Sequence, residues 1–144
     1  MTARILALLG ALAAIGTLRL TRSYLVEGDS MRPTLLNGDY VSGLRAPFRR
    51  HPAFLGPNAI LVARRPDQPH LPIIKRLARR EPNGHLWLLG DHPAASTDSR
   101  HFGPLSPATV EAVVWLRYWP PHRLRLLAGP FRPRPDAGWI DQIP

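Results

Sequence analysis

Cysteine is absent from this sequence of 144 residues, and its absence excludes disulfide bonds, thiol catalysis and thiolate metal sites. Lysine is almost absent as well, because Lys75 is the only lysine among nineteen Lys and Arg residues. Arginine keeps its proton in proteins, whereas a buried lysine can be neutral near pH 7. Lys75 is therefore the one residue of these nineteen that could take up a proton.

The overall composition is that of a globular or membrane-anchored protein. Apolar residues make up 44% of the chain, too much for a disordered protein, and 144 residues suffice for one domain with a modest core. The formal charge of +9 raises the question of nucleic acid. However, the arginines are spread along the chain and no nucleic-acid-binding motif accompanies them. We therefore expect membrane lipid as a partner and no nucleic acid.

The N-terminal segment is apolar but shorter than most membrane spans. Its uncharged core runs from Ile5 to Leu18, whereas roughly 20 residues normally cross a bilayer. Arg4 and Arg19 flank this core and can extend its reach by directing their charged ends to the membrane interface. We therefore expect residues 1–22 to form a single-pass transmembrane anchor.

Two other interpretations of this segment stay open. The tripeptide Ala11-Leu12-Ala13 offers the small-x-small site of a cleavable signal peptide, although the apolar stretch before it is short, and a buried helix has a similar composition. The arginines bear on orientation, because Arg19 and Arg22 follow the apolar core. Positive charge there argues against translocation of the body that follows.

A tight turn around one serine is specified by the segment EGDSMRPTL, residues 27–35. Gly28 allows another chain segment to approach closely, and Pro33 fixes its own φ while it restricts the residue before it. Asp29 and Ser30 can hydrogen-bond to local amides. Such a turn holds the Ser30 hydroxyl in place, but this hydroxyl is a useful nucleophile only if a base removes its proton.

The segment LPIIKRL, residues 71–77, predicts a strand that carries the only lysine. Side chains alternate along a strand, so Ile73 and Leu77 share the face of Lys75. Apolar neighbours would lower the pKa of the amine and make it a candidate base for Ser30. Alternatively, Lys75 is a chance survivor in an arginine-rich chain and its amine is in water.

The body of the chain is expected to be mostly β, because no strand–helix alternation of an α/β protein is present. The prolines of Arg65 to His70 predict a loop, and those after Pro120 predict a Pro- and Arg-rich tail. We divide the chain into an anchor (1–22), a body (23–120) and a tail (121–144). The expected strands are Ser23–Glu27, Asp39–Arg45, Ala59–Ala63, a strand through Lys75 to Arg80, His85–Leu89 and Glu111–Trp119.

Three segments in order resemble the sequence boxes of the type I signal peptidases: GDSMRPTLLNGDYV, IIKRL and GDHPAASTDSRHFGP. These enzymes are membrane-anchored serine proteases with a Ser/Lys pair. The resemblance implies a signal-peptidase-like β domain of antiparallel strands with one N-terminal apolar helix as a membrane anchor. The chain is too short for the inserted cap of larger members. It is most similar to compact ones, the nickel-type superoxide dismutase maturation proteases and the mitochondrial inner-membrane-type peptidases.

The resemblance also implies roles for individual residues. Ser30 would be the nucleophile and Lys75 the base, and the Ser30 backbone N–H would be one oxyanion donor. Some members place a second donor, a serine, where this chain has Gly28, so the second donor stays unknown. Ser96 would orient the lysine. The supporting residues would be Gly28, Met31, Pro33 and an ion pair of Asp98 with Arg100.

Histidines offer two alternatives to the lysine. A Ser/His/Asp triad could combine Ser30 with His85, His92 or His101 and an aspartate such as Asp91, although no G-x-S-x-G elbow surrounds the serine. A metal site from His92 and His101 lacks the usual ligand spacing, so we expect no metal and no cofactor.

The expected function is therefore cleavage of N-terminal signal or leader peptides from precursor proteins, with the catalytic domain on the extracytoplasmic side as the resemblance implies. A dedicated maturation protease for one precursor is the alternative within the same chemistry. A non-catalytic, basic, membrane-associated binding protein is the alternative of another class. The sequence does not predict an oligomeric state.

Overall fold

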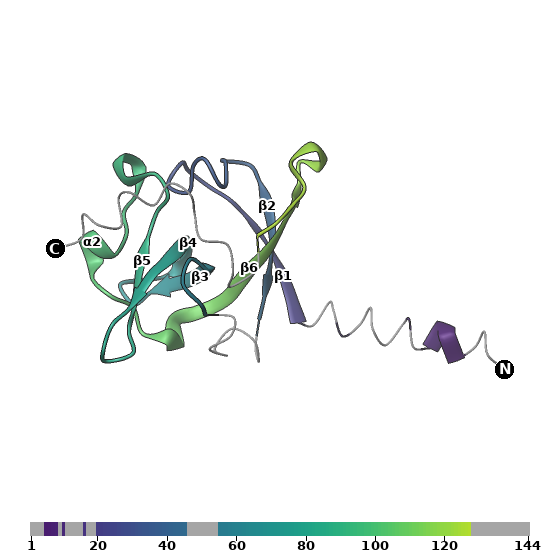
Figure 1. The fold of residues 1–144 in the computed structure, drawn as a ribbon, viewed down its shortest axis with the longest axis horizontal. Coiled ribbons are helices and arrows are strands. Elements are labelled where there is room, and N and C mark those ends of the chain that lie inside the picture. The colour runs from purple at the N-terminus through teal and green to yellow at the C-terminus, as the bar shows by residue number, and fades with distance from the viewer. Residues whose placement is uncertain (1–4, 9, 11–15, 17–19, 46–54, 128–144) are drawn as a thin grey trace.

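A single antiparallel sheet runs through the part of the chain that the computed structural model describes, residues 5–8, 10, 16, 20–45 and 55–127. The strand order is β1-β2-β6-β3-β4-β5, and β7 pairs with β6 (Figure 1). The strands are β1 Thr21–Leu25, β2 Tyr40–Leu44, β3 Ile60–Arg65, β4 Gln68–Arg80, β5 Leu86–Leu89, β6 Val110–Trp119 and β7 Arg125–Leu126. The short helices are η2 Pro93–Ala95, α2 Ser99–Phe102, η3 Pro107–Thr109 and η4 Pro121–Arg123. The predicted mostly β fold class is confirmed.

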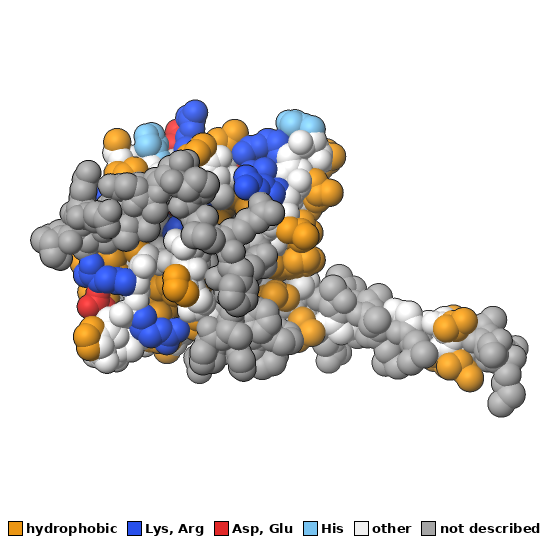
Figure 2. Space-filling model, viewed as in Figure 1, with side chains coloured by type: hydrophobic (Ala, Val, Ile, Leu, Met, Phe, Trp, Pro, Cys, Tyr) orange, Lys and Arg blue, Asp and Glu red, His pale blue; other side chains and the backbone are white. Residues whose placement is uncertain are grey.

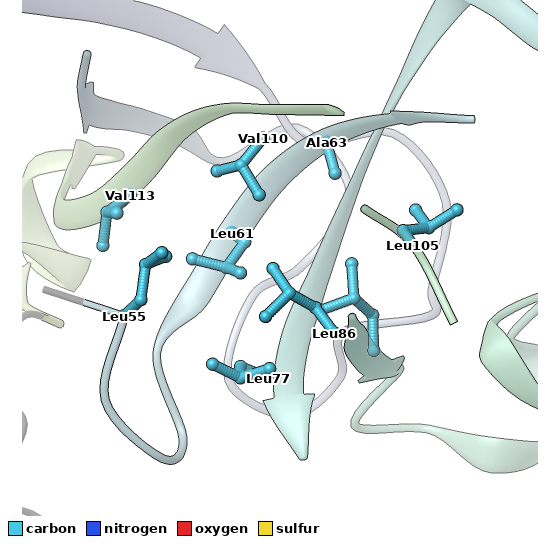
Figure 3. Close-up of a cluster of buried hydrophobic side chains, with 9 residues drawn as sticks. Leu55, Leu61, Ala63, Leu77, Leu86, Leu105, Val110 and Val113 are labelled. Atoms are coloured by element: carbon cyan, nitrogen blue, oxygen red, sulfur yellow. The ribbon is translucent and has the colours of Figure 1, made fainter. Parts of the chain in front are cut away.

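The sheet is buried on both faces at its centre, because β3 lies between β4 and β6 and its first four residues are all buried. One hydrophobic cluster includes Leu61, Leu77 and Leu86 (Figure 3). A second includes Met31 and Val62 and lies beneath the serine turn. Burial of each such side chain contributes about 2 kcal/mol, so both clusters help to hold the strands that carry the candidate site.

The loop that the prolines predict at Arg65 to His70 is only a turn at Pro66 and Asp67. β3 extends to Arg65 and β4 begins at Gln68, so the rest of the predicted loop is strand. β5 pairs only with the second half of β4, from Arg76 onward, so the first half has a described strand neighbour on one side alone. Proline is tolerated at such an edge because no donor is needed there.

The predicted tail also begins later than expected. Residues 121–127 fold onto the body, with β7 paired to β6 and the Leu127 N–H donating to Trp115 O at 2.8 Å. The rest of the predicted tail, 128–144, lies outside the described residues.

Most of the predicted anchor also lies outside the described residues, and β1 begins at Thr21, within the range that we assigned to the anchor. In the described part of the chain, no helix has the length and apolar character needed to cross a membrane.

Candidate active site

The loop between β1 and β2 forms the predicted serine turn. Gly28 and Gly38 have φ of +80° and +88°, which other residues rarely adopt. The Gly28 N–H donates to Asn37 Oδ1 at 3.0 Å, which closes the loop. Met31, 1% exposed, anchors the loop in the core beside the serine. Ser30 is consequently held at a fixed, half-buried position.

A buried carboxylate supports the far side of this loop. Asp39 accepts hydrogen bonds from the Leu36 N–H and from Arg123 of η4, each at 2.8 Å. Arg117 of β6 donates to Thr34 O at 2.6 Å. The segment after β6 therefore helps to position the serine turn, which explains why residues 121–127 belong to the body.

Lys75 and Ser30 lie side by side although 45 residues separate them: Lys75 Nζ is 2.6 Å from Ser30 Oγ. Lys75 comes from β4 and is only 5% exposed. Burial lowers the pKa of Lys75 from 10.5 to about 8, against the charges of Asp98 and Asp91, which raise it. With this pKa about a tenth of the molecules carry a neutral amine at pH 7, compared with fewer than about one in a thousand at a pKa of 10.5. The neutral form is the one that can act as a base for a hydroxyl.

A second buried network joins the lysine strand to the serine turn. Arg76 donates to both carboxylate oxygens of Asp91 at 2.7 Å and to Asn58 O at 2.8 Å. Thr34 Oγ1, from the serine turn, donates to Asp91 Oδ2 at 2.5 Å. Bidentate guanidinium–carboxylate bonds are geometrically specific, so this network fixes β4 against the turn at the residue next to Lys75.

The segment after β5 supplies the third part of the site. Asp98 accepts hydrogen bonds from the Arg100 guanidinium at 2.9 and 2.7 Å, from Ser96 Oγ at 2.6 Å and from the Gly90 N–H at 2.9 Å. Burial alone would raise the pKa of Asp98, but these donors lower it to about 2. A permanent negative charge therefore lies within electrostatic range of Lys75.

Gly90 allows this segment to pack directly against the serine turn. A Cβ at Gly90 would lie 2.1 Å from Ser96 Oγ and 2.6 Å from Ser30 O, closer than atoms can approach. The His92 N–H donates to Ser30 O at 2.9 Å. Ser96 and Ser30 thus lie on either side of a position where only glycine fits.

The structure does not bring the predicted residues of a Ser/His/Asp triad together. The Asp91 carboxylate accepts from Arg76 and Thr34, and the hydroxyl of Ser30 meets Lys75. His101 lies beside Asp98, where its side chain completes a helix cap. Among the described residues, no group of three His, Asp or Glu side chains is arranged to hold a metal ion.

A groove of about 540 Å³ leads away from the serine and the lysine. Its walls come from β1, from the start of the serine turn and from the first half of β4. Both strands run toward the Ser30–Lys75 pair along the groove. Apolar residues that line it include Leu25, Val26, Met31, Val62, Leu71, Pro72, Ile73 and Ile74.

The site combines a serine hydroxyl beside a buried amine with a groove between two strand edges. A serine peptidase with a lysine base requires a site of this kind. Comparison with known proteins agrees. The family model described as "Signal peptidase, peptidase S26" matches residues 1–79 and 78–119. The chain belongs to this family.

Curated relatives are subunits of mitochondrial proteases. The chain is 35% identical to mitochondrial ATP-independent inner membrane protease subunit 1a of Arabidopsis thaliana, over 67% of this chain and 69% of the relative. It is 32% identical to mitochondrial inner membrane protease subunit 1 of Xenopus tropicalis, over 82% of this chain and 78% of the relative. It is 33% identical to mitochondrial inner membrane protease subunit 2 of Mus musculus, over 71% of this chain and 69% of the relative. The predicted resemblance to the compact, mitochondrial inner-membrane-type peptidases is confirmed.

The predicted supporting residues lie around the turn and the third segment. Met31 and Asp98 are buried, whereas Gly28, Pro33 and Arg100 are exposed. Sequence reasoning missed the network of Arg76, Asp91 and Thr34. Two features of the sequence could have indicated this network. Arg76 directly follows the only lysine, and Asp91 lies in the segment GDHPAASTDSRHFGP, the third of the segments that resemble signal peptidase boxes. Their pairing depends on how β4 and the segment after β5 pack, which the sequence does not show.

Proposed function

We propose that this protein is a membrane-anchored serine endopeptidase of the signal peptidase I type that cleaves N-terminal signal or leader peptides, with Ser30 as nucleophile and Lys75 as general base. The observation that carries this proposal is the 2.6 Å contact between Ser30 Oγ and a buried amine whose pKa burial lowers to about 8. Signal-peptidase-type protease activity follows from the family. The Ser/Lys chemistry is our inference from the geometry.

The reaction has two steps, the formation of an acyl-enzyme and its hydrolysis. Neutral Lys75 accepts the Ser30 proton as Oγ attacks the peptide carbonyl, and the resulting ammonium gives that proton to the leaving amine when the C–N bond breaks. Lys75, neutral again, then accepts a proton from a water molecule that attacks the acyl ester. The ester bond breaks, Ser30 regains its proton from the lysine, and the leader is released as a carboxylic acid.

The oxyanion of each tetrahedral intermediate needs hydrogen-bond donors. The Ser30 N–H is our candidate for the first, and within the described part of the chain nothing accepts a hydrogen bond from it. One such donor lowers the barrier by about 3 kcal/mol in other serine proteases. Because Gly28 has no side chain to offer, the second donor must be another backbone group, a side chain or water.

The substrate is proposed to bind as an extended strand in the groove. β1 is the end of the strand order, and β4 before Arg76 has a described neighbour only in β3, so both groove walls present strand edges. A peptide can add to such edges through main-chain hydrogen bonds, while alternate side chains enter pockets. The resemblance to the signal peptidases also implies small residues, typically alanine, before the cut, and such residues suit a position beside Ser30.

Ser96, Asp98 and Arg100 are proposed as positioning residues. Asp98 is held by Arg100 and by the Ser96 hydroxyl, and its charge acts on Lys75. Ser96 lies across Gly90 from the serine turn. We propose that its hydroxyl oxygen accepts from the lysine and fixes the direction of the amine, because a buried amine needs an acceptor.

Membrane attachment is supported by the surface as well as by the apolar N-terminal segment. Leu25, Tyr40 and Trp119 are aligned across β1, β2 and β6, and are 45%, 40% and 52% exposed. Apolar side chains also gather along the edge of the molecule that the β6–β7 hairpin forms (Figure 2). The relatives are named as inner membrane proteases. We propose that the apolar segment before β1 is a single-pass anchor, that membrane lipid is a partner and that the catalytic domain is extracytoplasmic.

The deciding experiment incubates the full-length protein in detergent with candidate precursors and determines the new N-termini. Wild type is expected to release a leader at one site, while Ser30→Ala and Lys75→Arg fold normally and release none, because arginine keeps the charge but cannot accept a proton. Unchanged cleavage by Lys75→Arg would end the proposal. Processing of many precursors indicates general signal cleavage, and processing of one indicates a dedicated maturation protease. Precursor binding without cleavage by any form would support the non-catalytic alternative.

A further inference from the structure

Large apolar side chains are exposed at the base of the serine turn and on the β6–β7 hairpin, the segment 119–127 that runs from the end of β6 through β7. Their exposed fractions lie between 40% and 70%, and Figure 2 shows apolar side chains along this edge of the molecule. Monomeric soluble proteins rarely expose large apolar patches, and such a patch marks a site of interaction. We call these residues the apolar face: Leu25, Tyr40, Trp119, Leu124 and Leu126.

The register of the sheet places the apolar face on one side of the strands. Tyr40 pairs with Trp119, and directly paired residues point to the same side. Leu126 of β7 pairs with Leu116, and Leu116 pairs with Ser42, two residues after Tyr40. Side chains alternate along a strand, so Leu126 points to the same side as Tyr40. One flat partner can therefore cover the whole apolar face.

The composition of the hairpin identifies a lipid surface as this partner. Its sequence, WPPHRLRLL, contains His122, Arg123 and Arg125 and no acidic residue. His122 and Arg125 are exposed beside the leucines. Aromatic rings together with leucine and arginine are typical of protein surfaces at the membrane–water interface. Each arginine near an anionic membrane contributes about 1 kcal/mol, so a membrane rich in anionic lipid matches both the apolar side chains and the charge.

The apolar face is also tied to the membrane through β1. This strand begins at Thr21, directly after the apolar segment that we propose as the anchor, and ends at Leu25. Four steps along a strand span about 13 Å. Leu25 therefore lies within about 13 Å of the point where the chain leaves the anchor. The anchor consequently keeps the apolar face close to the lipid surface, whereas a protein partner has no such attachment.

The hairpin is hydrogen-bonded to the serine turn through two arginines. Arg123 Nη1 donates to Asp39 Oδ1, and Asp39 Oδ2 accepts from the Leu36 N–H, each at 2.8 Å. Arg117 joins the two segments, because its Nε donates to Arg123 O at 2.7 Å and its Nη1 donates to Thr34 O at 2.6 Å. Asp39 and Arg117 are 1% and 6% exposed. The position of the serine turn therefore depends on where Arg123 lies.

The hairpin consists of short elements that lipid can stabilise. β7 has two residues and η4 is a single turn, Pro121–Arg123. Exposed segments with few backbone hydrogen bonds open at a low cost in free energy. The Arg123 side chain is 20% exposed, so water reaches its ion pair with Asp39. Lipid that covers the hairpin excludes this water and strengthens the ion pair, because charges attract more strongly at low dielectric constant.

We propose that the apolar face and the β6–β7 hairpin dock on a membrane surface rich in anionic lipid, and that docking activates the site because Arg123 and Asp39 then hold the serine turn. This inference rests on the proposed peptidase function. In the undocked state the hairpin opens more often, Asp39 loses a donor, and the turn that carries Ser30 loses support. Anionic lipid binds the docked state better and so raises the fraction of active molecules.

The first measurement uses the absence of cysteine from the sequence. Full-length Leu124→Cys has a single thiol for an environment-sensitive dye, and it is reconstituted into vesicles of phosphatidylcholine, alone or mixed with phosphatidylglycerol. Brominated acyl chains should quench the dye, and more strongly when phosphatidylglycerol is present. The anchor inserts in both kinds of vesicle, so the difference reports the hairpin. Asn83→Cys, at the exposed turn between β4 and β5, is the control and should stay unquenched.

The second measurement compares kcat/KM for one soluble leader peptide in the two kinds of vesicle. Wild type should be about tenfold more active with phosphatidylglycerol, which corresponds to the free energy of about one hydrogen bond. Arg123→Gln removes the donor to Asp39, so it should lose this stimulation, while the dye at position 124 is still quenched. Arg80→Gln removes the same charge from an exposed position at the end of β4 and should keep the stimulation.

Several results would overturn the proposal. A dye at position 124 that stays unquenched, or that is quenched equally in both kinds of vesicle, would exclude docking on anionic lipid. A dye that is shielded in detergent only at high protein concentration, and never quenched in vesicles, would assign the apolar face to a second copy of the chain. Equal stimulation of Arg123→Gln and wild type would exclude the coupling to the serine turn. If wild type cleaves no peptide in any medium, the peptidase function fails and activation fails with it, while the dye still decides the lipid contact.

Discussion

Replacement of Lys75 by methionine should make the protein inactive and more stable at the same time. Lys75 is buried, and its pKa is lowered from 10.5 to about 8. At about 1.4 kcal/mol per pKa unit, keeping this amine charged in the folded state costs about 3 kcal/mol below pH 8. Methionine has a similar shape and no charge to bury, although it loses the hydrogen bond with Ser30, worth about 1 kcal/mol. We therefore expect a net gain of about 2 kcal/mol at pH 7.

The pH dependence of this gain follows from linkage. Between the folded pKa of about 8 and the unfolded value of 10.5, the unfolded chain binds more protons, so the wild type becomes more stable as the pH rises. Methionine does not titrate and lacks this increase. The free energy of unfolding of both proteins should be measured by urea denaturation in detergent at pH 7 and pH 10. The advantage of Lys75→Met should be largest at pH 7 and mostly lost at pH 10.

Two results would refute this reasoning. A Lys75→Met protein less stable than wild type at pH 7 would mean that the amine stabilises the fold as a charged group. An advantage of the same size at both pH values would mean that it comes from packing and not from the proton. Arginine at position 75 is the matched comparison, because it stays charged at both pH values. This variant should still fold but be less stable than the wild type at both pH values.

Three further changes test the surroundings of the site. Gly90→Ala places a methyl group 2.6 Å from Ser30 O and should lower kcat at least about a hundredfold, whereas Gly16→Ala, which meets nothing, should leave cleavage unchanged. Asp98→Asn should lower the free energy of unfolding by about 3 kcal/mol at pH 7, measured by urea denaturation. The pKa of Asp98 is lowered from 3.8 to about 2, so the stabilisation by its charge is present above pH 4 and lost as the pH falls through 2. A difference in stability between wild type and Asp98→Asn that persists at pH 2 would contradict this cause. Thr34→Val removes a donor to Asp91 and should cost about 1 to 2 kcal/mol with a measurable loss of kcat. Equal stability would show that this hydrogen bond does not stabilise the fold.

The sequence predicted the parts of the site that depend on local chemistry. A glycine–serine turn and the only lysine, on a strand, have few other interpretations, and the structure brings Ser30 and Lys75 together. Most strands were also predicted to within a few residues, because their apolar residues are continuous or alternate. Ile73 and Leu77, expected on the face of Lys75, both pack against the same core cluster.

The remaining features depend on contacts between distant segments. The prolines of β4 suggested a loop, because the sequence does not show which edge of a strand lacks a neighbour. A β-bulge at Glu111 changes the alternation of β6 through its pairing with β3. Arg123 falls in the segment predicted as a tail, yet Arg117 and Arg123 reach the serine turn and its buried carboxylate. Each of these needed the sheet register, which no single segment encodes.

The most direct measurement is the titration of the amine itself. Because Lys75 is the only lysine, lysine labelled with ¹³C at Cε gives one side-chain NMR signal from the full-length protein. Its chemical shift, followed from pH 6 to pH 11, should show a midpoint near 8. A midpoint at the ordinary value of 10.5 would mean that almost no neutral amine is present at neutral pH, and that Lys75 cannot be the base that activates Ser30.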